Sequence, residues 1–429
     1  MISTFISNFS PLRLRNFRIY LGGQTLSLIG TWLQVTAQSW VVWELTGSTA
    51  SLGWVWALNT LPILVISPWS GVWADRFDRR RILIYTQIGA MLLAFILAYL
   101  TQTEVVALWH VYLLSFMLGI LAAIDFPAQQ AFIGDLSGMS EVRKAVSLNM
   151  MVFQLSRIMG PAVGGVVLGR LGVAPAFWLN GLSFLAVVAT LLLVRSQQVR
   201  VSQQINPLRQ FGEALSFVRS QPHIQNLLLF ITLITFFALA IIANLLPAVA
   251  DEVLHGDAAT LGALMAASGA GAFVGTIFLV PYLQALLKPG LVLAYATIWT
   301  GLWYVLFSFA QSQFVAALCL FFVSIGPPIV VTMGIGLAQF FAPPDMRARL
   351  MSLFIMISFG TQPFAALIVG YSAEVLTTPI TIALYGGLLI AGALAMLLRP
   401  GLRGWELEKP KLASASRASG AQAEGPVVS

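Results

Sequence analysis

Two charged residues, Asp125 and Arg157, stand deep inside long apolar stretches of the sequence. Charged groups in such surroundings cost at least roughly 2.5–3.5 kcal/mol on membrane-insertion scales, so we expect both residues to serve a function. A buried carboxyl group can hold a proton near neutral pH, which makes Asp125 a candidate for proton coupling. The alternative is that Asp125 is a structural charge.

Arg157 admits three roles: neutralising Asp125, lining a cavity, or binding an anionic group of a ligand. On helices that rise 1.5 Å per residue, the two residues differ in depth by roughly 9 Å. A long arginine side chain could cover that difference, so all three roles stay open.

The other polar groups inside the apolar stretches are uncharged. Gln24, Thr31, Gln34 and Gln38 have a spacing that places them on one face of a helix. Further amides occur in later stretches, at Asn149, Gln154, Asn180 and Asn244. Such side chains suit a cavity for an amphiphilic or hydrophobic organic molecule, whereas a small multivalent anion usually needs paired arginines or lysines. For each amide the alternative is a hydrogen bond between helices.

The sequence offers no pattern for catalysis or metal binding. Cys319 is the only cysteine, and the three histidines, His110, His223 and His255, fall near the ends of apolar stretches. We find no nucleophile and base at matched depth and no Gly-x-x-x-x-Gly-Lys-Ser/Thr phosphate loop. We therefore expect no enzyme activity, no direct use of ATP, no metal and no cofactor.

Long apolar helices must position these residues. The 429 residues are 58% hydrophobic and only 9% charged, with a mean hydropathy of +0.87, and each apolar stretch approaches the roughly 20 residues that cross a bilayer. We predict an all-α membrane protein with twelve transmembrane helices in two six-helix lobes. The helices are expected over residues 17–44, 50–74, 81–102, 108–133, 143–168, 173–195, 224–250, 258–285, 288–310, 313–341, 349–372 and 377–398.

The same map divides the chain into five parts. We expect a cytoplasmic N-terminal segment (1–16), an N-terminal lobe (17–195), a cytoplasmic linker with a surface helix (196–223), a C-terminal lobe (224–398) and a disordered cytoplasmic tail (399–429).

Basic residues predict how this bundle sits in the membrane. With the N-terminus inside, all of the 23 Lys and Arg residues except Arg157 and Arg170 fall on the cytoplasmic side. This asymmetry is the one that orients membrane proteins, and a single missed span would invert it. We therefore expect a monomeric, multi-pass protein of the cell (inner) membrane with both termini in the cytoplasm, and no binding of nucleic acid.

The turn between the second and third predicted helices reads Gly71-Val-Trp-Ala-Asp75-Arg76-Phe-Asp78-Arg79-Arg80-Arg81. It resembles the signature G-x-x-x-D-R-x-G-R-R of the major facilitator superfamily, with Asp78 where that family usually has glycine. Three further segments are typical of the branch that holds macrolide and siderophore exporters: Glu44–Ser48, Asp125 with Pro127-Ala128, and Arg157–Gly165. The resemblance runs from about Phe17 to Leu398.

This resemblance implies that the charged turn latches the two lobes against the eleventh helix while a transporter is open outward. The latch residues would be Gly71, Asp75, Arg76, Arg79, Arg80, Arg347 and Arg349. An acid near a helix N-terminus gains about 0.3–1 kcal/mol from the helix dipole. The alternative is that these arginines only fix the topology. The resemblance also gives Asp125 a possible place in the charge network around this turn.

Helix five carries Gly160-Pro161-Ala-Val-Gly164-Gly165, which resembles the antiporter motif of superfamily exporters. Glycines four residues apart give a flat face for close helix packing, and Pro161 should bend the helix. We expect this motif at the interface between the lobes, near Gly271 and Gly275 of helix eight.

These features predict a secondary active transporter that exports an amphiphilic or hydrophobic small molecule, such as a drug, a macrolide or a siderophore-like compound, by alternating access. The expected partners are that small molecule, protons and the lipid bilayer. The alternatives are a lipid or lysophospholipid flippase, and a non-transporting receptor or scaffold on the same fold. The sequence leaves the substrate, the coupling ion and the direction of transport open.

Overall fold

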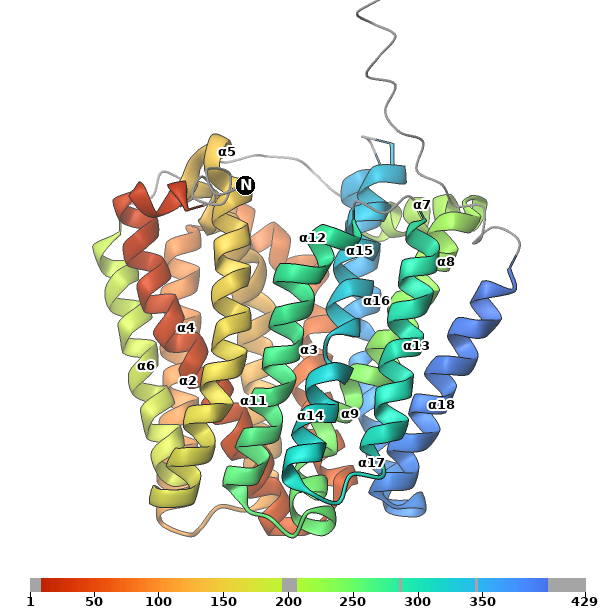
Figure 1. Ribbon diagram of the computed structural model, residues 1–429. Coiled ribbons are helices and arrows are strands. Elements are labelled where there is room, and N and C mark those ends of the chain that lie inside the picture. The colour runs from red at the N-terminus through yellow and green to blue at the C-terminus, as the bar shows by residue number, and fades with distance from the viewer. Residues whose placement is uncertain (1–8, 195–206, 285–287, 344–345, 400–429) are drawn as a thin grey trace, which may run out of the picture.

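The computed structural model describes residues 9–194, 207–284, 288–343 and 346–399. Within these ranges the protein is an all-helical bundle (Figure 1). The predicted tail beyond Arg399, the first eight residues and the start of the predicted linker fall outside the described residues.

The first half of the chain supplies six helical stretches. They are α2 (Arg15–Thr46), α3 (Thr49–Arg76), α4 (Arg79–Gln102), α5 (Leu108–Leu171), which contains two of them, and α6 (Ala174–Leu193). α5 counts as two because Gly138 has φ 70° and ψ 165°, a conformation that breaks a helix and that glycine adopts readily. A short 3-10 turn, η1 (Ser10–Arg13), precedes α2.

The second half also supplies six stretches, and several of them are composite. The seventh runs through α8 (Pro222–Leu233), η2 (Ile234–Leu239), α9 (Ala240–Asn244), α10 (Leu246–Ala248) and η3 (Val249–Val253). The eighth runs through α11 (Ala258–Val274), η4 (Gly275–Leu279) and α12 (Val280–Leu283). The others are α13 (Pro289–Phe307), α14 (Gln313–Val323) with α15 (Gly326–Phe341), α16 (Arg347–Gly360) with α17 (Gln362–Leu376), and α18 (Thr378–Leu397). The twelve predicted helices are confirmed.

Ten of these stretches in the described part of the chain are long and apolar enough to cross a membrane. The first stretch, α2, and the eleventh, α16 with α17, are not among the ten. α2 carries the amides of Gln24, Gln34 and Gln38, and those of Gln34 and Gln38 form hydrogen bonds with other helices.

Polar side chains cap the first turns of α3 and α4. The side chain of Ser48 accepts a hydrogen bond from the backbone N–H of Ser51 and so caps α3. Asp78 caps α4 in the same way through the N–H of Arg81. Such caps satisfy N–H groups that have no partner within the helix.

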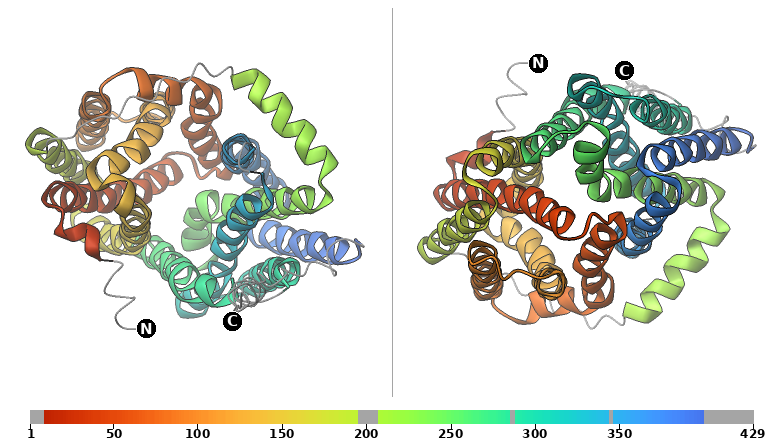
Figure 2. Two further views of the ribbon diagram at one scale, coloured as in Figure 1. Left: turned by 90° about the horizontal axis from the view of Figure 1, so that it is seen from above. Right: turned by 90° about the horizontal axis from the view of Figure 1, so that it is seen from below.

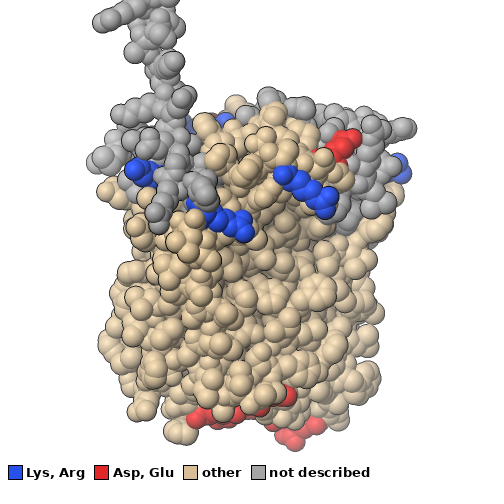
Figure 3. All heavy atoms as spheres, turned by 90° about the vertical axis from the view of Figure 1, so that its right-hand side faces the viewer, with Lys and Arg blue, Asp and Glu red and all other residues tan. Residues whose placement is uncertain are grey.

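The twelve stretches form two lobes that stand side by side, as the views along the bundle show (Figure 2). α2 to α6 make the N-terminal lobe, and α8 to α18 make the C-terminal lobe. α2 begins and α18 ends toward the same end of the bundle (Figure 1). On the face shown in Figure 3, Lys and Arg lie at this end together with some acidic side chains, and the charged residues at the opposite end are Asp and Glu. We call these the basic end and the acidic end. α7 (Pro207–Ser220) lies along the edge of the basic end (Figure 1).

The two larger hydrophobic cores differ in extent. One core lies within the N-terminal lobe and contains Phe17, Tyr20 and Phe132. The larger core fills the C-terminal lobe and continues across to Trp40 and Trp43 of α2. The lobes therefore share a packed core where α2 ends, at the acidic end.

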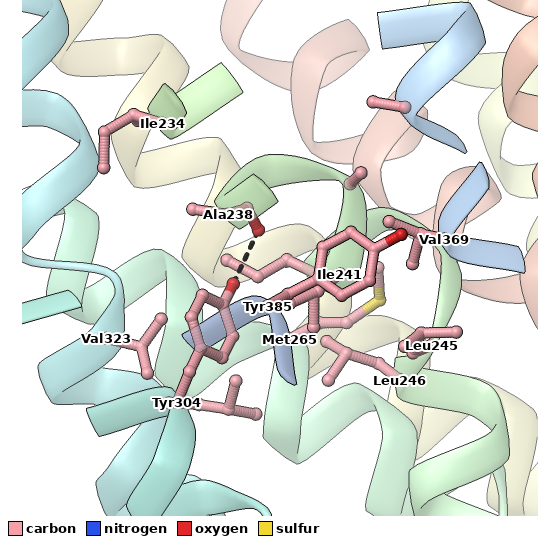
Figure 4. Close-up of a cluster of buried hydrophobic side chains, with 14 of the residues drawn as sticks. Ile234, Ala238, Ile241, Leu245, Leu246, Met265, Tyr304, Val323, Val369 and Tyr385 are labelled. Carbon is pink, nitrogen blue, oxygen red and sulfur yellow. Dashed lines mark hydrogen bonds between the residues drawn. The ribbon is translucent and has the colours of Figure 1, made fainter. Parts of the chain in front are cut away.

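A tyrosine of the C-terminal core donates a hydrogen bond to a backbone carbonyl of the π-helical segment η2. The hydroxyl of Tyr304 in α13 donates a hydrogen bond of 2.6 Å to the carbonyl of Ala238 (Figure 4). Ile241, Leu246 and Val323 belong to the same buried cluster (Figure 4). A π-segment disturbs the regular ladder of helical hydrogen bonds, and the buried tyrosine supplies a donor at that point.

Candidate functional site

A cavity of about 290 Å³ lies between the two lobes. From the N-terminal lobe, α2, α3 and α5 contribute Trp32, Val35, Trp56, Phe153, Arg157 and Pro161. From the C-terminal lobe, the seventh, eighth and eleventh stretches contribute Leu239, Ala240, Ile242, Ala243, Met265, Ser268, Phe359 and Gln362. The wall is therefore mainly apolar and aromatic, and both lobes are needed to form it.

Arg157 is the only charged residue among the described residues that line this cavity. Its guanidinium carbon lies 5.6 Å from the centroid of the Trp32 ring, which places the cation against an aromatic ring. Contacts of this kind are worth about 0.5–1 kcal/mol, and about 2 kcal/mol when desolvated. Burying an arginine at membrane depth costs at least roughly 2.5–3.5 kcal/mol, so Trp32 offsets only part of that cost.

The described residues provide no ion pair or hydrogen bond to the Arg157 guanidinium. Asp125, the predicted partner in one of the three roles, is occupied elsewhere. It accepts hydrogen bonds from the hydroxyl of Thr86 and from Nε2 of Gln87, the latter at 3.1 Å. Both donors belong to α4, so Asp125 links α4 to α5 within the N-terminal lobe through uncharged groups.

The predicted amides mostly bond to other helices or to their own. Nδ2 of Asn180 donates to Oε1 of Gln34 at 2.6 Å, and Nε2 of Gln38 donates to the hydroxyl of Ser115 at 2.7 Å. Nδ2 of Asn244 donates to the carbonyl of Ala240 at 2.7 Å. These contacts match the alternative of a structural role, and none of the seven amides lines the cavity.

Three amides remain of the predicted set. Nε2 of Gln154 donates to the hydroxyl of Thr276 at 3.0 Å and so joins α5 to the other lobe. Gln24 and Asn149 are buried, and the side-chain oxygen of each has no hydrogen-bond partner among the described residues. Substrate contact by these amides stays a prediction.

Helix five packs through its glycine motif on two neighbours. Gly160 and Gly164 face α2 of the same lobe, where a Cβ on Gly160 would come within 2.4 Å of Trp32. Gly165 faces α11 of the other lobe, and a Cβ on Gly262 would lie 2.5 Å from the Cα of Gly165. The two backbones meet directly there because neither residue has a side chain.

The prediction that this motif lies near Gly271 and Gly275 was wrong. Those glycines face Phe321 and Ile325, and the glycines of α11 that face α5 are Gly262 and Gly269. Residues seven apart share a helix face, so Gly262 and Gly269 form one stripe while Gly271 and Gly275 lie on another side of the helix.

A second pair of helices closes the acidic end. The hydroxyl of Thr49 in α3 donates to the carbonyl of Gly370 in α17 at 2.8 Å. Ser48 donates to Glu374, and the indole N–H of Trp43 donates to Oδ2 of Asp251 at 2.8 Å. Sequence reasoning missed these contacts between the lobes, and the motif that begins at Glu44 was the available signal.

The predicted latch can be followed only in part. The side chains of Asp75, Arg347 and Arg349 lie outside the described part of the chain. Among the residues that the structure describes, no atom would lie within 4 Å of a Cβ on Gly71. Arg76 is exposed at the end of α3. The latch stays a prediction.

Arg79 forms a buried ion pair that sequence reasoning missed. Its Nη1 lies 2.8 Å from Oδ1 of Asp135, and the two side chains are only 9% and 6% exposed. The Nε of Arg79 also donates to the carbonyl of Ala74 at 3.0 Å. The only signal for Asp135 was its position as an acid near the end of an apolar stretch.

Arg80 also bonds within its own lobe. Its guanidinium donates to the carbonyls of Leu191 and Leu192, the latter at 2.7 Å. Both carbonyls belong to the last turn of α6, where helical carbonyls lack partners and a cation is favourable.

A two-lobed bundle of twelve helices around a central cavity defines the fold of major facilitator transporters. A family model described as "Transmembrane secretion effector" matches residues 6–424, and the chain belongs to this family.

The chain is similar to several transporters at low identity. The Staphyloferrin A transporter of Staphylococcus aureus is 24% identical over 61% of this chain and 66% of its own length. The enterobactin exporter EntS of Citrobacter koseri is 26% identical over 92% of this chain and 94% of its own length. An uncharacterized MFS-type transporter of Bacillus subtilis, YfiS, is 28% identical, and the match spans only 49% of its length.

Solved structures support the fold. The nucleoside transporter NupG has a TM-score of 0.72 at 13% identity, covering 89% of this chain and 98% of its own. A bacterial homolog of the human lysosomal transporter Spinster, in an inward-facing and unoccupied conformation, has a TM-score of 0.64 at 15% identity, covering 89% and 94%. At these identities the likeness concerns the fold alone.

Removing the acid of the buried ion pair should destabilise the N-terminal lobe. We expect Asp135→Asn to lower the free energy of unfolding by about 3–5 kcal/mol, because Arg79 would keep its buried charge without a carboxylate. Thermal unfolding in detergent measures this. The control is Asp78→Asn, since Asp78 is exposed and asparagine caps a helix equally well. Equal, small shifts for both variants would contradict this role.

Adding a side chain at Gly262 should open the acidic end. We expect Gly262→Val to push Gly165 away and to speed the reaction of a cysteine at buried Ala50 with a water-soluble maleimide at least fivefold. The measurement uses Cys319→Ser protein, so that the introduced thiol reacts alone. Gly387→Val is the control, because a Cβ at Gly387 would meet none of the described atoms within 4 Å. The same reaction rate in both variants would show that the glycine contact does not close this end.

Proposed function

We propose that this protein is a secondary active transporter that exports an amphiphilic or hydrophobic small molecule by alternating access. The observation that carries the proposal is the central cavity, whose wall is mainly apolar and is built by both lobes. A ligand held there contacts both lobes at once, so its binding energy can differ between the two arrangements of the lobes. Because one chain builds the whole wall, we propose that a monomer suffices.

We propose that the lobes comprise residues 17–195 and 224–398 and move as units. The contacts between them at the acidic end, through Gly165 with Gly262 and through Thr49 with Gly370, favour a closed acidic end here. If the basic end faces the cytoplasm, as the asymmetry of basic residues favours, both termini are cytoplasmic and this arrangement is inward-facing. The membrane would be the inner, or cell, membrane.

The latch fits this scheme as part of the opposite, outward-open arrangement. Its members would be Gly71, Asp75, Arg76, Arg79, Arg80, Arg347 and Arg349. α3 and α16 already lie next to each other, so the turn is close to the eleventh helix. The ion pair of Arg79 with Asp135 would hold the turn in shape while Asp75 engages the eleventh helix.

We assign proton coupling to Asp125. Its hydrogen-bond donors, Thr86 and Gln87, are uncharged, so a proton can bind without breaking an ion pair. Asp135 differs because it is paired with the guanidinium of Arg79, so a proton could bind there only at the expense of that ion pair. Protonation of Asp125 would change its bonds to α4 and so alter the packing of the N-terminal lobe.

Transport assays test this proposal in cells that lack their own exporters. We expect the protein to lower the accumulation of an amphiphilic dye at least fivefold, and a protonophore to abolish that effect. Asp125→Asn should lose the protonophore-sensitive efflux while keeping its amount in the membrane. The matched control is Asp257→Asn, because Asp257 caps α11 and asparagine can replace it there.

Two results would contradict the proposal in different ways. Efflux that persists in Asp125→Asn with its sensitivity to the protonophore would remove Asp125 from coupling. Dye accumulation that is the same with and without the protein, for a panel of uncharged and charged amphiphiles, would contradict transport itself.

A further inference from the structure

The cavity between the lobes is chemically asymmetric. Its wall consists of aromatic and aliphatic side chains with two uncharged polar groups, Ser268 and Gln362, and the one cation of Arg157. No carboxylate from the described residues lines it. A cavity that only had to hold an uncharged hydrophobic molecule would gain nothing from a guanidinium in its wall.

The guanidinium of Arg157 is held in place but not neutralised. Trp32 lies under it at 5.6 Å, and the T-shaped contact of Trp32 with Phe153, with ring centroids 5.8 Å apart, fixes the indole in turn. The carboxylate of Asp125 is occupied by Thr86 and Gln87 on α4. An arginine can donate five hydrogen bonds, and none of them is used within the described part of the chain.

Arg157 also lies at the contact between the lobes. A Cβ on Gly269 of α11 would be only 2.6 Å from the backbone carbonyl of Arg157. The backbone that carries the cation is therefore fixed against the C-terminal lobe. The side chain of Arg157 lines the cavity, to which Trp56 and Phe359 contribute rings from the two lobes.

We infer that the cavity selects an amphiphile with a single anionic group, such as a carboxylate or sulfonate, attached to an aromatic or aliphatic body. The anionic group would accept hydrogen bonds from Arg157 in the two-point geometry that guanidinium groups favour. The body of the molecule would pack among Trp32, Trp56, Phe153 and Phe359. One cation in the wall matches one negative charge, and further charges on the ligand would be buried without partners.

This inference rests on the proposed function, which needs only that the cavity holds an amphiphile. The charge of that amphiphile is the new element. A matched pair of fluorescent probes separates the two statements: 1-anilinonaphthalene-8-sulfonate carries one negative charge, and N-phenyl-1-naphthylamine has the same rings without it.

The experiment measures saturable binding of both probes to the full chain in phosphatidylcholine nanodiscs, after subtraction of empty nanodiscs. We expect Arg157→Gln to raise the Kd of the sulfonate probe at least tenfold and to change that of the uncharged probe less than twofold. Arg157→Lys keeps the charge but not the two-point geometry, so it should restore part of the affinity. The control is Arg170→Gln, because Arg170 is an exposed arginine outside this cavity.

A second comparison uses the two probes with the wild-type protein alone. The sulfonate probe should displace the uncharged probe, and its affinity should exceed that of the uncharged probe at least fivefold. Equal affinities in wild type, or equal weakening of both probes by Arg157→Gln, would overturn the charge selection while leaving the cavity and transport in place. Lack of saturable binding by either probe would overturn the charge selection and the proposed cavity together.

Discussion

The architecture depends on how closely the two lobes approach each other along two pairs of helices. At Gly165 and Gly262 the backbones of α5 and α11 touch, and at Thr49 and Gly370 the same is true of α3 and α17. Glycine permits this approach: no side chain separates Gly165 from Gly262, and Gly370 leaves room for the hydroxyl of Thr49. The lobes are thus joined by backbone contacts concentrated toward the acidic end, where the larger hydrophobic core also crosses from one lobe to the other.

Charges within the bundle fall into two kinds. Arg79 with Asp135 is a closed pair, buried and satisfied, and it stabilises the turn that joins α3 to α4. Asp125 and Arg157 have no oppositely charged partner among the described residues. The hydrogen-bond donors to Asp125 are uncharged, and Arg157 contacts an aromatic ring. Groups whose charge is not fixed by a partner can respond to a proton or to a ligand, which is why the proposed coupling and recognition fall on these two.

Hydropathy predicts ten of the helices directly, because a long apolar segment in a bilayer must satisfy its own backbone hydrogen bonds. The first and eleventh stretches are less apolar, and the distribution of basic residues supports their inclusion. Contacts between helices were not predictable to the same degree. The amides of Gln34 and Asn180 are far apart in the sequence, and only the packing of α2 against α6 brings them together. The packing of α11 was equally hard to predict. The helical period places Gly262 and Gly271 on different faces of α11, but the sequence does not show which face contacts α5. Arg157 was recognised as unusual from its surroundings alone, and its position in the wall of a cavity was one of the roles considered.

Alternating access makes one demand that a single measurement can test, namely that the two ends of the bundle open in opposite senses. The measurement is pulsed electron paramagnetic resonance on Cys319→Ser protein that carries pairs of spin labels. Labels at exposed Leu45 and Val375 report the distance between the lobes at the acidic end, and labels at exposed Ser140 and Gln284 report it at the basic end. With ligand and a change of pH, the account predicts a longer distance between the first pair and a shorter distance between the second. Distances that stay constant, or that lengthen and shorten together, would contradict it.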